Sequence, residues 1–169
     1  MLSPYVRGIG MGSRRITETL KRCELFSDLS EPELRTIAKS GSVEEFAAGQ
    51  TIYEQGDVGA KLYILSEGQV SLDRKLTMGH THMVRATVYV LRETPRRRLL
   101  GGWCTLVGQQ HVQMCSATCD KPTKMISIGC SEFREMIDKN PGMRLKVLEK
   151  LILILRDRIE SSYTAMETL

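Results

Sequence analysis

No stretch of this 169-residue sequence is apolar for long enough to cross a membrane. The longest aliphatic run, residues 151–155, is far shorter than the roughly 20 residues that a membrane-spanning helix needs. Residues 1–12 also lack the continuous apolar stretch and the small-residue cleavage site of a signal peptide. We therefore expect a cytoplasmic protein that has no membrane partner.

Cysteine is scarce and does not occur in Cys-x-x-Cys pairs. The odd number of five argues against a disulfide framework, and the spacing argues against a zinc ribbon. Reduced thiols are the simpler interpretation. A thiol-based redox sensor stays open, because Cys115 and Cys119 share one face of an expected strand and Cys104 belongs to the same region.

Motifs of the common enzyme classes are absent. The sequence has no Gly-x-Ser-x-Gly, no Walker loop, no His-Glu-x-x-His and no credible catalytic carboxylate dyad, so we expect no catalytic residues. His80 and His82 lie on one side of an extended segment, but a metal-binding β-barrel with such a histidine pair needs a glutamate after three or four intervening residues. Ala86 and Thr87 stand there, so we expect a solvated loop without a metal.

Net charge is small, +4, which excludes a dedicated nucleic-acid binder. The excess is concentrated in residues 74–98, which hold seven basic residues and one acidic residue. We expect this segment to form an exposed β-hairpin followed by solvated arginines at Arg96, Arg97 and Arg98.

Helical patterns flank the central part of the chain. Residues 1–13 contain three glycines without an apolar period, and we expect them to be flexible. From Ile16 the apolar residues recur at helical spacing. Ser30 followed by Glu33 is a capping box that predicts a second helix to about residue 40, and Ser131 predicts the N-cap of a third.

The middle of the chain changes to a period of two. Short β-rich runs occupy residues 48–53, 61–65, 69–76, 83–91, 112–119 and 124–128. Within the fourth, Val84, Ala86, Val88 and Val90 alternate with other residues and are expected to face the core. Many short strands predict a mainly β protein, an antiparallel jelly-roll-like β-roll with flanking helices, over residues 14–142.

A long C-terminal helix is expected over residues 143–169. Its heptad seam, with Leu148, Ile152, Leu155 and Ile159 at the centre, predicts a homodimer through this helix. The seam continues through Ser162 and Met166 to Leu169. A second stripe faces elsewhere and is expected to pack on the roll; it consists of Val147, Leu151 and Ile154.

Residues 48–70 resemble the cyclic nucleotide-binding domain family. Glycines that suit tight turns alternate with inward-facing apolar positions at the family's spacing. The positions in register are Gly49, Ile52, Gly56, Asp57, Gly59, Tyr63, Ile64, Gly68 and Val70. The resemblance covers residues 20–159 and implies an eight-stranded roll that holds a cyclic nucleotide beside a short phosphate-binding helix.

The family's phosphate cassette reads Gly-Glu, a few apolar residues, then Arg-x-Ala-Thr. There the arginine pairs with the cyclic phosphate and the glutamate accepts a hydrogen bond from the ribose. The resemblance implies that the matching region here binds the ligand; it comprises Gly101, Gly102, Trp103, Cys104, Cys115, Ser116, Ala117 and Thr118.

Both charged contacts of that cassette are missing. Trp103 stands in the glutamate position and Cys115 in the arginine position. The sequence therefore predicts a dimeric regulatory sensor in which the usual cyclic nucleotide binding is weak or lost, with a cyclic nucleotide or another small phosphate-containing ligand as its candidate ligand. Two alternatives stay open: a ligand-free dimerisation scaffold, and the sensor part of a transcriptional regulator that lacks its DNA-binding domain. No helix-turn-helix follows the long helix, so we expect no direct DNA binding.

Overall fold

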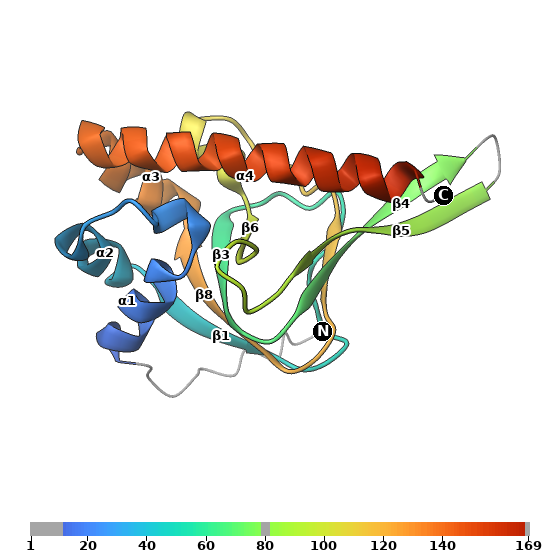
Figure 1. Cartoon of the computed structure of the whole chain (residues 1–169), viewed down its shortest axis with the longest axis horizontal. Coiled ribbons are helices and arrows are strands. Elements are labelled where there is room, and N and C mark those ends of the chain that lie inside the picture. The colour runs from blue at the N-terminus through green and yellow to red at the C-terminus, as the bar shows by residue number, and fades with distance from the viewer. Residues whose placement is uncertain (1–11, 79–81, 168–169) are drawn as a thin grey trace.

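The protein is a β-roll with helices at one end and one long helix along its side (Figure 1). A computed structural model describes residues 12–78 and 82–167. The elements are α1 (Ser13–Lys21), η1 (Glu24–Phe26), α2 (Glu31–Ala38), β1 (Ser42–Phe46), β2 (Thr51–Tyr53), β3 (Lys61–Glu67), β4 (Val70–Met78), β5 (His82–Leu91), β6 (Leu99–Gly101), η2 (Trp103–Val107), β7 (Ser116–Cys119), β8 (Thr123–Gly129), α3 (Cys130–Asp138) and α4 (Pro141–Glu167). Residues 1–11 of the segment that was expected to be flexible lie outside the described residues, and so do His80 and Leu169.

Eight strands form two four-stranded sheets. Their orders are β1-β8-β3-β6 and β2-β7-β4-β5, and every pairing is antiparallel. The predicted roll with flanking helices and a long C-terminal helix is therefore confirmed. Strands β1 and β6 were not expected, because β1 is a polar edge strand and β6 has three residues, so neither shows an apolar period.

The expected alternation along β5 holds only for its first part. Ala86 and Val88 are buried, but from Tyr89 onward the buried positions move to the other face, so that Tyr89 and Leu91 are buried instead. The cause is a register shift, since Leu72 pairs with Tyr89 and Asp73 pairs with Thr87, leaving Val88 as the extra residue. A bulge of this kind re-aims the side chains that follow it.

The short helices pack against the first sheet and close one end of the roll. Phe26 of η1 and Phe133 of α3 meet edge to face, with ring centroids 5.7 Å apart. The capping box is present, since the Ser30 backbone N–H donates to Glu33 Oε2 at 2.7 Å. Helix α3 begins two residues earlier than predicted, so Gly129 and not Ser131 occupies its N-cap position.

Helix α4 runs the length of the molecule and contacts η1, α3 and β5 (Figure 1). It starts at Pro141, where proline suits the first helical position, and Asn140 Oδ1 accepts a hydrogen bond from the Met143 N–H. The stripe formed by Val147, Leu151 and Ile154 is buried against the roll, as predicted. Within residues 12–78 and 82–167, no helix combines the length and apolarity needed to span a membrane.

Truncation of Phe133 to alanine tests this packing. Because its side chain is fully buried against Phe26, Phe133→Ala is expected to lower the free energy of unfolding by about 3–5 kcal/mol. The matched control, Val107→Ala, shortens a half-exposed side chain and is expected to change stability by less than about 0.5 kcal/mol. Urea denaturation measures both, and equal losses would contradict the assignment of Phe133 to the core.

Candidate ligand cavity beneath the long helix

A cavity of about 380 Å³ lies between α4 and the sheet β2-β7-β4-β5. Most of its lining is aliphatic or aromatic, and a few polar side chains converge on it, which is the usual character of a small-molecule site. It is lined by Tyr53, Leu72, Arg74, Leu76, Val88, Tyr89, Trp103, His111, Gln113, Met114, Cys115, Arg158, Ser162 and Met166. A roomier hollow between α2 and α3 is lined mainly by polar and charged side chains and has no such character.

Two of the eight predicted site residues line this cavity. Trp103 and Cys115 contribute side chains to it, and the indole ring meets the His111 ring edge to face at 5.4 Å. Cys104 lies next to the cavity wall, since its Sγ is 3.1 Å from Nδ1 of His111.

The two glycines of the cassette serve close backbone packing. Gly101 has a φ of +115°, and a Cβ there would overlap the carbonyl oxygen of Lys61. At Gly102 a Cβ would come within 2.5 Å of the Gly59 carbonyl oxygen. Only glycine lets β6 and the start of η2 lie this close to the neighbouring backbone. The helix that follows them, η2, is a single 3-10 segment of five residues.

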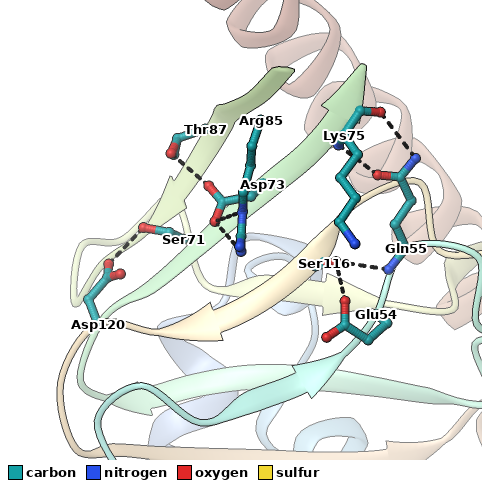
Figure 2. Close-up of polar contacts among 9 residues, drawn as sticks. All are labelled: Glu54, Gln55, Ser71, Asp73, Lys75, Arg85, Thr87, Ser116 and Asp120. Atoms are coloured by element: carbon teal, nitrogen blue, oxygen red, sulfur yellow. Dashed lines mark hydrogen bonds and ion pairs between the residues drawn. The ribbon is translucent and has the colours of Figure 1, made fainter. Parts of the chain in front are cut away.

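Ser116, Ala117 and Thr118 do not line the cavity. Ala117 is fully buried in the core between the sheets. Ser116 belongs to a polar cluster on the roll, where its hydroxyl donates to Glu54 at 2.8 Å and accepts from the Gln55 backbone N–H at 3.0 Å (Figure 2). These bonds anchor β7 to the segment after β2 and occupy the hydroxyl group.

The long interval between Trp103 and Cys115 brings two polar side chains to the cavity. Residues 108–114 run antiparallel to residues 54–59, held by Gly59 N–H to His111 O and Gln113 N–H to Asp57 O, both at 2.8 Å. His111 and Gln113 are buried, and Nε2 of the imidazole lies 3.3 Å from Gln113 Oε1. Burial lowers the pKa of His111, so the imidazole is neutral at pH 7.

Burial also disfavours ionisation of four of the five thiols. It raises the pKa values of Cys23, Cys115, Cys119 and Cys130, with Arg74 and Arg158 opposing the shift at Cys115. Thiolate formation at neutral pH is therefore disfavoured at these four positions. All five cysteines are free, and no group of three or more metal-ligating side chains occurs among residues 12–78 and 82–167.

The buried cation of the cavity, Arg158, was not among the residues predicted from the sequence. Arg158 of α4 is 9% exposed, its guanidinium carbon lies 3.5 Å from the centre of the Tyr89 ring, and Nη2 donates to the Leu99 carbonyl oxygen. Burial lowers its pKa. Arg158 continues the buried stripe of Val147, Leu151 and Ile154 at helical spacing. A charged residue in an apolar stripe was therefore the sequence signal for a buried cation.

The predicted run of solvated arginines is only partly correct. Arg96 is exposed, but Arg98 is buried and donates to the carbonyl oxygens of Thr94 and Leu65, both at 2.8 Å. Arg97 lies over the Tyr89 ring and 3.9 Å from Asp157. Arg98 thus satisfies carbonyl groups of strand β3 and of the turn that precedes β6. It is a structural residue and does not line the cavity.

The comparisons with known proteins agree with this geometry. The sequence model of one family, described as cyclic nucleotide-binding domain, matches residues 43–140, more than half of the chain. The chain belongs to the cyclic nucleotide-binding domain family. Among solved structures, a cyclic nucleotide-binding domain from Methylobacillus flagellatus is similar with a TM-score of 0.70 and 18% identity, over 90% of this chain and 80% of that one.

Two further similar proteins are regulators, one matched by its structure and one by its sequence. The N-terminal domain of a transcriptional regulator from Streptomyces coelicolor has a TM-score of 0.63 and 24% identity, over 85% of this chain and 94% of that one. The global nitrogen regulator of Synechococcus elongatus is 27% identical over 127 residues, which are 75% of this chain and 52% of that protein. The chain thus spans about half the length of the curated relatives it matches.

The buried imidazole predicts a pH dependence of stability. Above the ordinary pKa of 6.5, His111 is neutral in both the folded and the unfolded state. As the pH falls below 6.5, the unfolded chain takes up the proton while the folded chain resists it, so the free energy of unfolding decreases. The expected result is a smaller loss of stability between pH 7.5 and pH 5.5 for His111→Gln than for the wild type, measured by urea denaturation. Parallel pH profiles of the two proteins would contradict the lowered pKa.

Proposed function

We propose that this domain is a regulatory sensor that acts as a homodimer through α4 and whose cavity has weak or lost affinity for cyclic nucleotides. The observation that carries the proposal is that Trp103 and Cys115 both line the cavity. The resemblance aligns these two residues with the family's glutamate and arginine. The cavity itself persists, and this favours a sensor with a different ligand over a ligand-free scaffold.

Dimerisation is supported by the outer face of α4. Ile152 is 66% exposed and Ile159 is 54% exposed, and Leu145 and Met166 extend the same stripe by one heptad at each end. Leu148 and Leu155 of the seam are half-buried and already pack against the core. Aliphatic side chains that repeat every seven residues on a helix surface suit pairing with a second copy of that helix.

The dimer is tested by charge at the centre of the seam. Ile152→Lys combined with Ile159→Lys places two cations on the paired face, so we expect sedimentation velocity at tens of micromolar to show a monomer in place of a wild-type dimer. Glu160→Lys with Thr164→Lys introduces lysines on the same helix outside the seam and is the control that keeps the dimer. A monomeric wild type, or an unchanged mass for the double isoleucine variant, would overturn this part of the proposal.

Weak cyclic nucleotide binding is tested by calorimetry with cyclic AMP and cyclic GMP. A charge-assisted contact contributes about 1.5–3 kcal/mol, so loss of the arginine alone weakens binding by about ten- to a hundredfold. We expect no submicromolar dissociation constant for the wild type. Trp103→Glu with Cys115→Arg restores the family's residues and is expected to increase the affinity for cyclic AMP measurably. Submicromolar binding by the wild type would contradict the proposal.

A further inference from the structure

The cavity contains a buried positive charge that the family resemblance does not account for. We propose that Arg158 is the anion-binding residue of this site and that the ligand is a small monocarboxylate with an apolar body. The inference rests on the proposed function, because it names the ligand class of the same sensor cavity.

The hydrogen bonding of Arg158 is incomplete. Nη2 donates to the Leu99 carbonyl oxygen, but Nε and Nη1 are buried without a hydrogen-bond partner among the residues that the structure describes. A guanidinium group has five N–H donors, and the two unpartnered nitrogens carry three of them. The contact with the Tyr89 ring uses the face of the guanidinium and leaves these in-plane donors free. Leaving them unsatisfied is unfavourable, and an anionic oxygen would satisfy them.

The charge of Arg158 is also unbalanced within the cavity. No aspartate or glutamate is among the described lining residues, and the second lining cation, Arg74, donates to the Met114 carbonyl oxygen at 3.2 Å. Two carboxylates act on Arg158 from outside the lining, and both have other partners. Asp157 accepts a hydrogen bond from the Tyr89 hydroxyl at 2.6 Å, and Glu24 accepts one from the Arg98 backbone N–H at 3.2 Å. The site therefore has an excess of positive charge and suits an anion.

The polar cluster of Figure 2 provides the contrast. There, Asp73 accepts from Arg85 at 2.8 Å and from Thr87 at 2.6 Å, and the Gln55 side chain bonds the backbone of Lys75. On the sheet surface, Arg85 thus has an ion-pair partner in Asp73. Arg158 has no such partner among the described residues although it is far more buried than Arg85, and this directs the inference to the cavity.

The rest of the cavity defines the ligand body. Leu72, Leu76 and Val88 form an aliphatic wall, and Trp103 and Tyr89 add aromatic rings. One deeply buried cation balances one negative charge, whereas a phosphomonoester carries close to two at pH 7. A cyclic phosphodiester also carries one, but its polar ribose suits the aliphatic and aromatic lining less well than an apolar body does. A carboxylate on an aliphatic or aromatic body matches both the charge and the lining.

The test uses the whole chain and two matched probe pairs. Octanoate is compared with 1-octanol, and indole-3-acetate with indole-3-acetamide, in thermal melting and calorimetry at constant ionic strength, with cyclic AMP as a separate arm. We expect at least one carboxylate to raise the melting temperature of the wild type and its neutral counterpart to bind at least tenfold more weakly, because the charge-assisted contact is lost.

Two variants assign the effect to Arg158. Arg158→Met is expected to abolish the carboxylate response and to leave the melting temperature of the ligand-free protein unchanged or higher, because removal of an uncompensated buried charge relieves its desolvation. Arg158→Gln gives the same ligand readout if the methionine variant does not fold. Arg156→Met, an exposed arginine on the same helix, is the control and is expected to retain the response.

Each remaining outcome overturns the inference. These outcomes are equal binding of the neutral probes, a carboxylate response that survives in both Arg158 variants, and no response to any carboxylate. If the seam variants still dissociate a wild-type dimer and cyclic AMP still binds weakly, the proposed function stands and only the ligand class is wrong. Tight binding of cyclic AMP without dependence on Arg158 would overturn both.

Discussion

The packing of α4 along the roll is the interaction on which the rest of the site depends. Val147, Leu151 and Ile154 are buried against the core that η1 and α3 build around Phe26 and Phe133. This contact fixes the rotation of the helix about its axis. Since neighbouring turns of a helix cannot rotate independently, the residue one turn further along the buried stripe, Arg158, must also face inward.

This constraint explains why a charge is buried at the cavity. An arginine in this stripe is desolvated without a carboxylate among the lining residues, and its contacts with Tyr89 and the Leu99 carbonyl group offset only part of that penalty. A leucine at the same position would extend the apolar stripe at less energetic cost. Arg158 holds two of the three buried side-chain nitrogens that lack a hydrogen-bond partner among the described residues, and unsatisfied buried groups in native proteins call for an explanation.

The two faces of α4 serve different purposes. The inner stripe joins the helix to the roll and leads to Arg158 in the cavity wall, while the outer stripe around Ile152 and Ile159 leaves aliphatic side chains in solvent. Ser162 and Met166 lie on the predicted seam and also line the cavity. Cavity and seam thus meet near the C-terminal end of one rigid element, so a ligand held under α4 and a partner paired along it would act on the same helix.

Local sequence signals determined much of the fold. Glycine spacing in residues 48–70, the capping box at Ser30 and the two stripes of α4 are read from neighbours along the chain, because turn, cap and helix preferences are local. Strand β1 was not predicted because an edge strand can be polar. The change of face along β5 was not predicted because a bulge depends on the pairing with β4.

The composition of the cavity was decided by tertiary structure. From the sequence, Trp103 and Cys115 could be aligned with the family cassette, but whether they faced one cavity depended on how β6, η2 and the loop before β7 fold back on Gly59 and Lys61. Arg98, in a basic run, became a structural residue because backbone carbonyl groups surround it. Arg158, in a helix far along the chain, became the cavity's buried cation because long-range packing decides which charges lose their contact with water.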